Sequence, residues 1–289
     1  RITVKSGKSG TNTSVIKTKP QIPNLQWDNT VKAANIKYDN AYVFGVPGQY
    51  KRSIRGQIPA YRDSFTIKGS MPEPELVAMQ QLVRELRKAS ITIPQGAISF
   101  SESTAGAELK LVASYFSPLL SQLVEITNME SHNVFAEGIL RAISLEKTGK
   151  WSRKEAIKYC QQFWKEKGID LSGANLYDGS GLSRFNHLSA RQMGGILYYM
   201  RQSAHFDVFY HSLPIAGVSG SIKSMFHKTV AYNNLRAKSG YIERVRSYCG
   251  YVKSGTGEER VFVIMANNYA CSATRMRLDM ETVLRTTTD

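Results

Sequence analysis

Between residues 1 and 70, short runs of β-branched and aromatic residues alternate with Gly and Pro. Runs of this kind, bounded by turn residues, are typical of β-strands. We therefore expect a small β-rich module in this part of the chain. Its strands should include residues 14–17, 41–45, 51–56 and 64–67.

After Pro72 the apolar positions change to a spacing of three and four residues, which is the helical period. The first such stretch predicts a helix over 73–88, with Pro74 in the first turn, where a helix tolerates proline. Ser152 and Ser189 are the expected N-caps of two later helices, and Glu155 completes a capping box with Ser152. The further helices expected are around 117–124, from 134 to 141, from 152 to about 167, from 189 to 200, and from 273 to 284.

Three runs near the C-terminus predict neighbouring antiparallel strands. The first ends at Lys238-Ser239-Gly240, the second covers 246–252, and the third covers 260–266. Ser-Gly-Thr-Gly at 254–257 is typical of a hairpin turn between the second and third strands. The amphipathic helix over 273–284 should cover this sheet.

Composition limits the class of protein. At 289 residues and 42% hydrophobic, the chain can bury a substantial core as one large domain or two smaller ones. The 38 Lys and Arg exceed the 23 Asp and Glu by a formal charge of +15, which makes polyanions natural partners. No helix-turn-helix, zinc-finger or RNA-binding signature is present, so we do not expect nucleic acid to be the partner. An anionic cell wall or membrane surface fits the charge, and a basic surface that aids solubility is the alternative.

Other residue types exclude further classes. Cys160, Cys249 and Cys271 are too few and too scattered for a disulfide scaffold or a zinc cluster. The five histidines are isolated from one another, so we expect neither metal catalysis nor any other cofactor. No run approaches the roughly twenty apolar residues of a membrane span, and the first residues have no signal-peptide pattern. If the protein is exported, its signal lies outside this sequence.

The tripeptide Lys-Ser-Gly also occurs at 5–7, 8–10 and 253–255, but only the copy at Lys238 closes a predicted strand. There the lysine supplies a positive charge, Ser239 supplies a hydroxyl donor, and Gly240 lets a substrate backbone come close. These three residues together can hold a carboxylate.

Two further motifs precede this one in a fixed order. Ser131-His132-Asn133 stands before a helical pattern, and residues 177–184, which contain Asp178-Gly179-Ser180, lie between it and Lys238. Ser-x-Asn followed about a hundred residues later by Lys-Ser-Gly matches two of the three motifs of β-lactamases and penicillin-binding proteins. From about Met71 to the C-terminus the chain resembles the class C low-molecular-mass penicillin-binding proteins, which are serine D-alanyl-D-alanine carboxypeptidases and endopeptidases. Before Met71 the resemblance is looser.

The resemblance implies an α/β (α+β) fold, in which helices flank an antiparallel sheet as in penicillin-binding transpeptidases and β-lactamases. It implies that residues 1–70 are part of a β-rich inserted domain without chemistry, and that 71–289 are the C-terminal part of the penicillin-binding domain. The implied partners are peptidoglycan stem peptides and β-lactam antibiotics. The implied location is the periplasm or cell envelope.

The resemblance also assigns roles. Ser131 would relay a proton to the leaving amine, and Asn133 would bind the acyl side chain of the substrate. Lys238 and Ser239 would receive the terminal D-Ala carboxylate, while Gly240 leaves room for the peptide. We also count Asp178 and Ser180 as substrate-binding candidates, although a role in shaping the turn explains these residues better than a reactive role. Taken alone, Ser131 also fits a helix N-cap, Asn133 a loop amide and Lys238 a solvated charge at a strand edge.

A nucleophile is still needed, and the resemblance places it in a Ser-x-x-Lys helix upstream of this chain. The Ser-x-x-Lys motif occurs twice inside the chain, which is about as often as chance predicts for so degenerate a motif. In the match at 14–17, an extended run would point the two side chains to opposite faces, and the match at 144–147 follows Ser-x-Asn in the wrong order.

We therefore expect an enzyme whose upstream segment docks as a separate polypeptide and covers the apolar faces of Leu119, Leu123 and Val134. The alternative is a catalytically inactive homologue that binds peptidoglycan peptides. A basic nucleic-acid-binding protein ranks far behind both.

Overall fold

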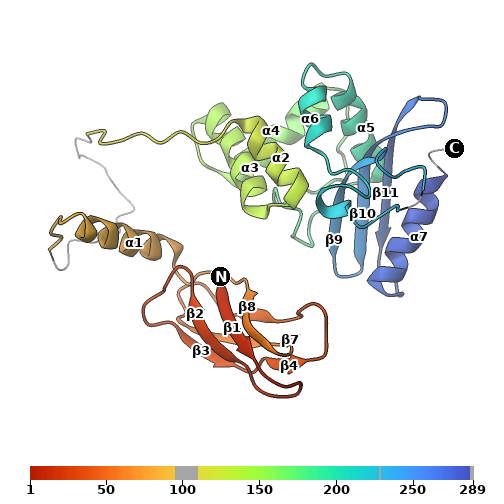
Figure 1. Ribbon diagram of the computed structural model, residues 1–289. Helices are drawn as coiled ribbons and strands as arrows, with labels where there is room; N and C mark the ends of the chain where they lie inside the picture. Colours follow the sequence, from red (N-terminus) through yellow and green to blue (C-terminus); the bar gives the residue numbers. More distant parts are fainter. Residues whose placement is uncertain (95–109, 228, 287–289) are drawn as a thin grey trace. The chain divides into compact units, whose positions relative to one another are not determined.

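The computed structural model describes residues 1–94, 110–227 and 229–286 (Figure 1). The chain divides into two compact units, Arg1–Lys110 and Leu111–Asp289. The domain boundary expected at residue 70 lies inside the first unit and stays a prediction.

The first unit is built mainly from short strands. The strands are β1 (Ile2–Ser6), β2 (Ser14–Thr18), β3 (Gln26–Asn29), β4 (Lys32–Ala34), β5 (Tyr42–Phe44), β6 (Lys51–Arg55), β7 (Gln57–Pro59) and β8 (Arg62–Ile67). They pair in the orders β2-β1-β8, β3-β6-β5 and β4-β7. Alternate residues such as Ile2, Val4 and Ile54 point into a common apolar core, as the period of a strand requires. Each of the four predicted runs falls on one of these strands.

Helix α1 (Pro74–Lys88) belongs to the same unit and confirms the helix predicted over 73–88. Pro74 stands in its first turn, and Arg87 and Lys88 in its last turn face the negative end of the helix dipole.

The second unit contains the predicted three-stranded sheet. Its strands β9 (Arg236–Ile242), β10 (Val245–Lys253) and β11 (Glu259–Asn267) are antiparallel, with β10 in the centre. The hairpin turn at 254–257 is confirmed: the Ser254 amide donates to the Glu258 carbonyl at 2.8 Å. Gly250 lets β9 and β10 approach, because a Cβ there would lie 2.0 Å from the Arg236 carbonyl oxygen.

Both faces of this sheet are covered. On one face, Met280 and Leu284 of α7 (Ala273–Arg285) pack with Tyr248 and Phe262. On the other, Tyr251 packs with Leu197 and Leu213 beside α5 (Ala190–Arg201) and α6 (Phe206–Ser212), and its hydroxyl donates to the Leu197 carbonyl. Tyr248 and Tyr251 lie on opposite faces because they are three positions apart on a strand whose side chains alternate. Figure 1 shows α7 on one side of the sheet and α5 on the other.

A group of three helices completes the unit: α2 (Leu120–Glu130), α3 (Asn133–Thr148) and α4 (Arg153–Glu166). Ser152 and Ser189 are confirmed as N-caps, with hydroxyls that accept from the amides of Glu155 and Gln192. The interpretation of Ser131 as an N-cap is wrong, because Ser131 ends α2 and His132 caps α3.

Candidate active site

Ser131 occupies the sharp turn between two helices. Its backbone is left-handed, with a φ of 54° and a ψ of 51°, a conformation that costs a non-glycine residue about 1–2 kcal/mol. The turn lets α3 start at Asn133, only two residues later. The His132 ring accepts a hydrogen bond from the Phe135 amide at 3.4 Å, so this histidine has a capping role.

Lys238, on β9, reaches this turn. Its Nζ donates to Ser131 Oγ at 2.9 Å and to the Ser239 carbonyl oxygen at 2.8 Å. Neither acceptor is an acid, and no ion pair of Lys238 occurs within the described ranges. Ser131 and Lys238, which are 107 positions apart in the sequence, are thus brought together around an uncompensated positive charge.

Burial shapes the electrostatics of this lysine. Desolvation lowers the pKa of Lys238 below its ordinary value, since burial disfavours the charged form. Cys249 lies directly across from it on β10. Burial raises the pKa of the Cys249 thiol to about 11, against the opposing effect of the Lys238 charge, so the thiol is neutral at pH 7 and does not pair with the lysine. A carboxylate arriving at Lys238 would therefore supply the missing counter-charge.

Ser239 and Gly240 follow on the same strand. The Ser239 hydroxyl donates to Ser221 Oγ at 2.7 Å, in a segment that the sequence did not assign to the site. Gly240 meets a constraint from the sheet itself, because a Cβ there would lie 2.5 Å from Ser247 Oγ on β10. The room predicted for a substrate peptide is thus not the only reason for glycine at this position.

Asn133 is the first residue of α3 and is exposed. Among the described residues its side-chain amide makes no hydrogen bond, so it can bind an incoming group. Asn133 follows Ser131 by two positions in the sequence and lies on α3, the helix that starts at the site.

Asp178 and Ser180 have partners within their own surroundings. Asp178 accepts from the amides of Gly181 and Ser183 at 2.7 Å and 2.8 Å. The Ser180 hydroxyl and amide both donate to Glu137 on α3, at 3.0 Å and 3.1 Å. These contacts favour the turn-shaping interpretation and tie the loop at 177–183 to α3.

Glu137 was missed in the sequence, where it looks like any helix-surface acid. Partial burial raises its pKa, but hydrogen bonds from Ser180, Arg141 and Gly179 outweigh that effect, so the pKa of Glu137 lies below its usual value. The carboxylate is ionised at neutral pH and acts as an anchor for the loop.

Neither internal Ser-x-x-Lys match has the geometry of a nucleophile and its base. Ser144 is fully buried in α3 and lies 3.3 Å from the Thr148 hydroxyl, whereas Lys147 is exposed. Ser14 and Lys17 lie on strand β2, which points side chains three positions apart to opposite faces.

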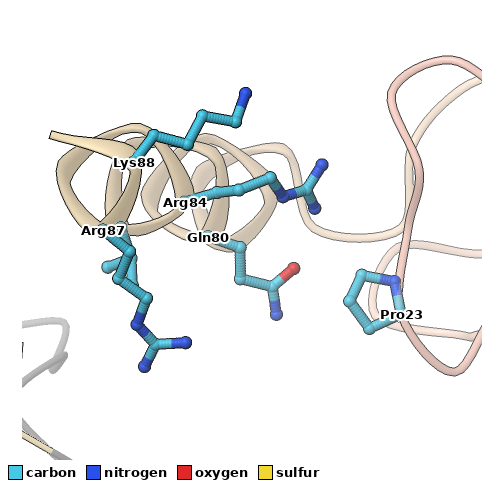
Figure 2. Close-up of a pocket in the computed structure, with 6 residues that line it drawn as sticks. Pro23, Gln80, Arg84, Arg87 and Lys88 are labelled. Carbon is cyan, nitrogen blue, oxygen red and sulfur yellow. The ribbon is translucent and has the colours of Figure 1, made fainter. Parts of the chain in front are cut away.

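A cavity of about 620 Å³ lies in the first unit and contains none of the predicted site residues. Figure 2 shows Gln80 and Arg84 of α1 reaching toward Pro23, with Arg87 and Lys88 extending to either side of the helix. This lining offers positive charge but no nucleophile or acid. We therefore centre the candidate site on Ser131 and Lys238.

Within the described ranges, no helix is long and apolar enough to cross a membrane. No three His, Cys, Asp or Glu side chains in the same ranges are grouped so that they could hold a metal ion.

Known proteins resemble the chain in sequence. It is 25% identical over 224 residues to the D-alanyl-D-alanine carboxypeptidase of Actinomadura sp. strain R39. The matched region makes up 75% of this chain and 41% of that protein. It is 31% identical over 194 residues to a carboxypeptidase of Mycobacterium tuberculosis. This match makes up 64% of this chain and 41% of the relative. The chain thus spans about half the length of the curated relatives it matches, between 41% and 55% for the first three.

The fold is similar to penicillin binding protein 4 (dacB) of Haemophilus influenzae, crystallised with a β-lactam. The TM-score is 0.76 at 21% sequence identity, over 99% of this chain and 67% of that one. This likeness confirms the predicted α/β fold with an antiparallel sheet. The sequence model of the D-Ala-D-Ala carboxypeptidase 3 (S13) family matches residues 1–287. The chain therefore belongs to the S13 family of D-Ala-D-Ala carboxypeptidases, as the order of its motifs implied.

Proposed function

We propose that this chain forms the substrate-binding and proton-transfer side of a serine D-alanyl-D-alanine carboxypeptidase or endopeptidase acting on peptidoglycan stem peptides. The contact of 2.9 Å between Lys238 Nζ and Ser131 Oγ carries the proposal. It brings together two of the three motifs that the chemistry needs, and membership of the S13 family supports the same reaction.

The terminal D-Ala carboxylate would bind at Lys238 and Ser239. Lys238 has no acidic partner in the described part of the chain, and the Ser239 hydroxyl stands beside it as a second donor. A hydrogen bond between charged groups contributes about 1.5–3 kcal/mol, which is enough to select a free carboxylate over a neutral chain end.

Acyl transfer would follow from this binding. The nucleophilic hydroxyl attacks the carbonyl carbon of the penultimate D-Ala, the C–N bond breaks, and the acyl group remains on the enzyme as an ester. The departing amine takes a proton from Ser131, which regains one from the base that deprotonated the nucleophile. Water then hydrolyses the ester. Asn133 would hold the acyl side chain during these steps.

We assign the nucleophile to a Ser-x-x-Lys helix of the same protein outside these 289 residues. The burial of Ser144 and the extended backbone at Ser14 favour this assignment over either internal match. The same observations favour, as a second candidate, a catalytically inactive homologue that only binds peptidoglycan peptides.

We infer that residues 1–70 form part of an inserted module without catalytic residues, and that 71–289 contribute to the penicillin-binding domain. β-Lactams would acylate the same nucleophile. The formal charge of +15 suits an anionic cell wall or membrane surface, and the protein would act in the periplasm or cell envelope.

A comparison of two forms of the protein tests the function. Both the 289-residue chain and the longer protein with its upstream region are incubated with benzylpenicillin, and their intact masses are recorded. We expect a covalent adduct on the longer protein only, together with release of D-Ala from a stem peptide. An adduct on the shorter chain would move the nucleophile into it, with Ser144 as the first suspect, and no adduct on either form would favour the inactive homologue.

A further inference from the structure

Ser221 is a third hydroxyl at the candidate site, and it lies in a segment without a recognised motif. It stands in the short 3₁₀ turn η1 (Gly220–Ile222), between α6 and β9 in the sequence. This turn contacts both α2, which ends at Ser131, and β9, which carries Lys238 and Ser239. It therefore connects the two elements that form the site.

The turn is held in place by several contacts. Gly220 has a φ of +58°, and a Cβ there would lie 2.8 Å from Pro214 and 2.9 Å from the carbonyl oxygen of Met129, two residues before Ser131. Ser219 Oγ accepts from the Ile215 amide at 3.0 Å and contacts Met129 Sδ at 3.7 Å. The position of Ser221 is thus set by packing against the end of α2.

We propose that Ser221 is a positioning residue that orients the Ser239 hydroxyl toward the substrate carboxylate. This inference rests on the proposed function of the site. The two hydroxyl oxygens are 2.7 Å apart. A hydroxyl has one proton to donate and two lone pairs that accept. When a carboxylate arrives, Ser239 turns its proton to the ligand, and Ser221 donates its own proton to Ser239 Oγ.

The Ser221 hydroxyl matters because it is the partner that holds the Ser239 side chain in one orientation. Without Ser221, the Ser239 side chain loses the partner that restricts its rotation, so part of its orientation must be ordered when the ligand binds. Lys238 does not replace this partner, because its Nζ donates to the carbonyl oxygen of Ser239 and not to the hydroxyl. The effect should therefore depend on the carboxylate and appear in the KM.

Three variants of the longer protein test the proposal: Ser221→Ala, Ser221→Thr and Ser224→Ala. Ser224 is a matched control, since it is an exposed serine in the same segment and makes no hydrogen bond among the described residues. Each variant is assayed with an N-acylated D-Ala-D-Ala peptide and with its C-terminal amide. For the free carboxylate, Ser221→Ala should raise KM about three- to tenfold with little change in kcat. For the amide, KM should stay within twofold, and Ser221→Thr should restore the wild-type KM.

The outcomes separate this proposal from the function itself. Equal losses with both substrates would indicate a merely structural role for Ser221, and no loss with either would remove it from the site; both results overturn the proposal. A wild-type protein that releases no D-Ala contradicts the proposed function instead. In that case calorimetric titration with N-acetyl-D-Ala-D-Ala decides: the same three- to tenfold weakening in Ser221→Ala supports the positioning role, and wild-type-like affinity or no binding overturns it.

Discussion

At the scale of single residues, Ser131 and Lys238 indicate a functional site only because their side chains are in contact. Alone, each has an ordinary explanation, and the N-cap explanation of Ser131 is wrong. Their contact at 2.9 Å places a hydroxyl against an ammonium that has no acid nearby in the described residues. A cation in that state attracts an anion more strongly than a lysine already paired with a carboxylate.

Replacement of Lys238 by Ala in the longer protein should slow acylation by a carboxylate-bearing peptide about ten- to hundredfold. The reason is the loss of a charge-assisted contact of about 1.5–3 kcal/mol, where 1.4 kcal/mol is a factor of ten. Acylation rates are measured by rapid quenching and mass spectrometry, with Lys154→Ala, an exposed lysine on α4, as the control. Rates within twofold of wild type would remove Lys238 from the carboxylate site.

The same lysine predicts a pH dependence. Burial lowers the pKa of Lys238, so its positive charge is lost at a lower pH than in an ordinary lysine. The KM for a carboxylate-bearing substrate should therefore rise on the alkaline side, as the lysine deprotonates below its usual pKa of 10.5. In Lys238→Arg the rise should disappear, because arginine stays charged throughout this range. Steady-state kinetics from pH 6 to about pH 10.5 measure this, and an identical alkaline rise in both proteins would refute the assignment.

At the scale of elements, local signals predicted the starts of α4 and α5 but not that of α3, which His132 caps in place of Ser131. Ser152 and Ser189 cap helices because a hydroxyl one residue before a helix satisfies an amide that the helix itself leaves free. The link between α3 and the loop at 177–183 had no such signal. It depends on Glu137, whose partners Gly179 and Ser180 lie more than forty residues away.

Glu137→Gln should lower the free energy of unfolding by about 1–2 kcal/mol at pH 7, since a charged acceptor of several hydrogen bonds becomes neutral at a partly exposed site. The folded-state pKa of Glu137 is lowered, so its contribution is present above the unfolded pKa and is lost as pH falls through the folded pKa. Urea titrations at pH 7 and at about pH 3 should therefore show the gap to wild type closing in acid.

Glu146→Gln on the same helix serves as the control for this prediction. Glu146 is exposed and makes no ion pair among the described residues, so its change should stay within about 0.5 kcal/mol. A gap for Glu137→Gln that keeps its size at low pH would contradict the role of the ionised carboxylate.

At the scale of the whole molecule, the second unit leaves much apolar surface exposed near α2 and α3. Leu119 is 71% exposed and Val134 is 72% exposed, as expected from the sequence, whereas Leu123 is half-buried. Tyr115 and Phe116, just before α2, are 94% and 86% exposed. Each Å² of uncovered apolar surface forgoes about 25 cal/mol, against a net stability of about 5–15 kcal/mol for a typical protein.

This exposure favours the proposal that the segment to which we assign the nucleophile covers these residues. Material purified from its source should contain a second polypeptide, visible by denaturing electrophoresis and mass spectrometry. The 289-residue chain prepared alone should self-associate and bind an apolar dye. A single monomeric species of 32.3 kDa that unfolds cooperatively and binds no dye would show that the chain closes its own core.

Periodicity and local chemistry were sufficient to predict most elements, including α1 and the strands β9, β10 and β11, because spacing along the chain determines which side chains share a face. The order of the motifs was sufficient to predict the family and to select Ser131 and Lys238. Their contact could be inferred only from the resemblance, since no local pattern relates residues 107 positions apart.

Other features depended on folding. The lowered pKa of Lys238 comes from burial, the anchoring role of Glu137 from a distant loop, and the place of Ser221 from the packing of η1 between α2 and β9. Each of these properties belongs to groups that meet only when separate elements pack together. An exposed serine or a helix-surface glutamate has the same local sequence signature whether or not a distant partner arrives, which is why the linear pattern did not distinguish Ser221 or Glu137 from their neighbours.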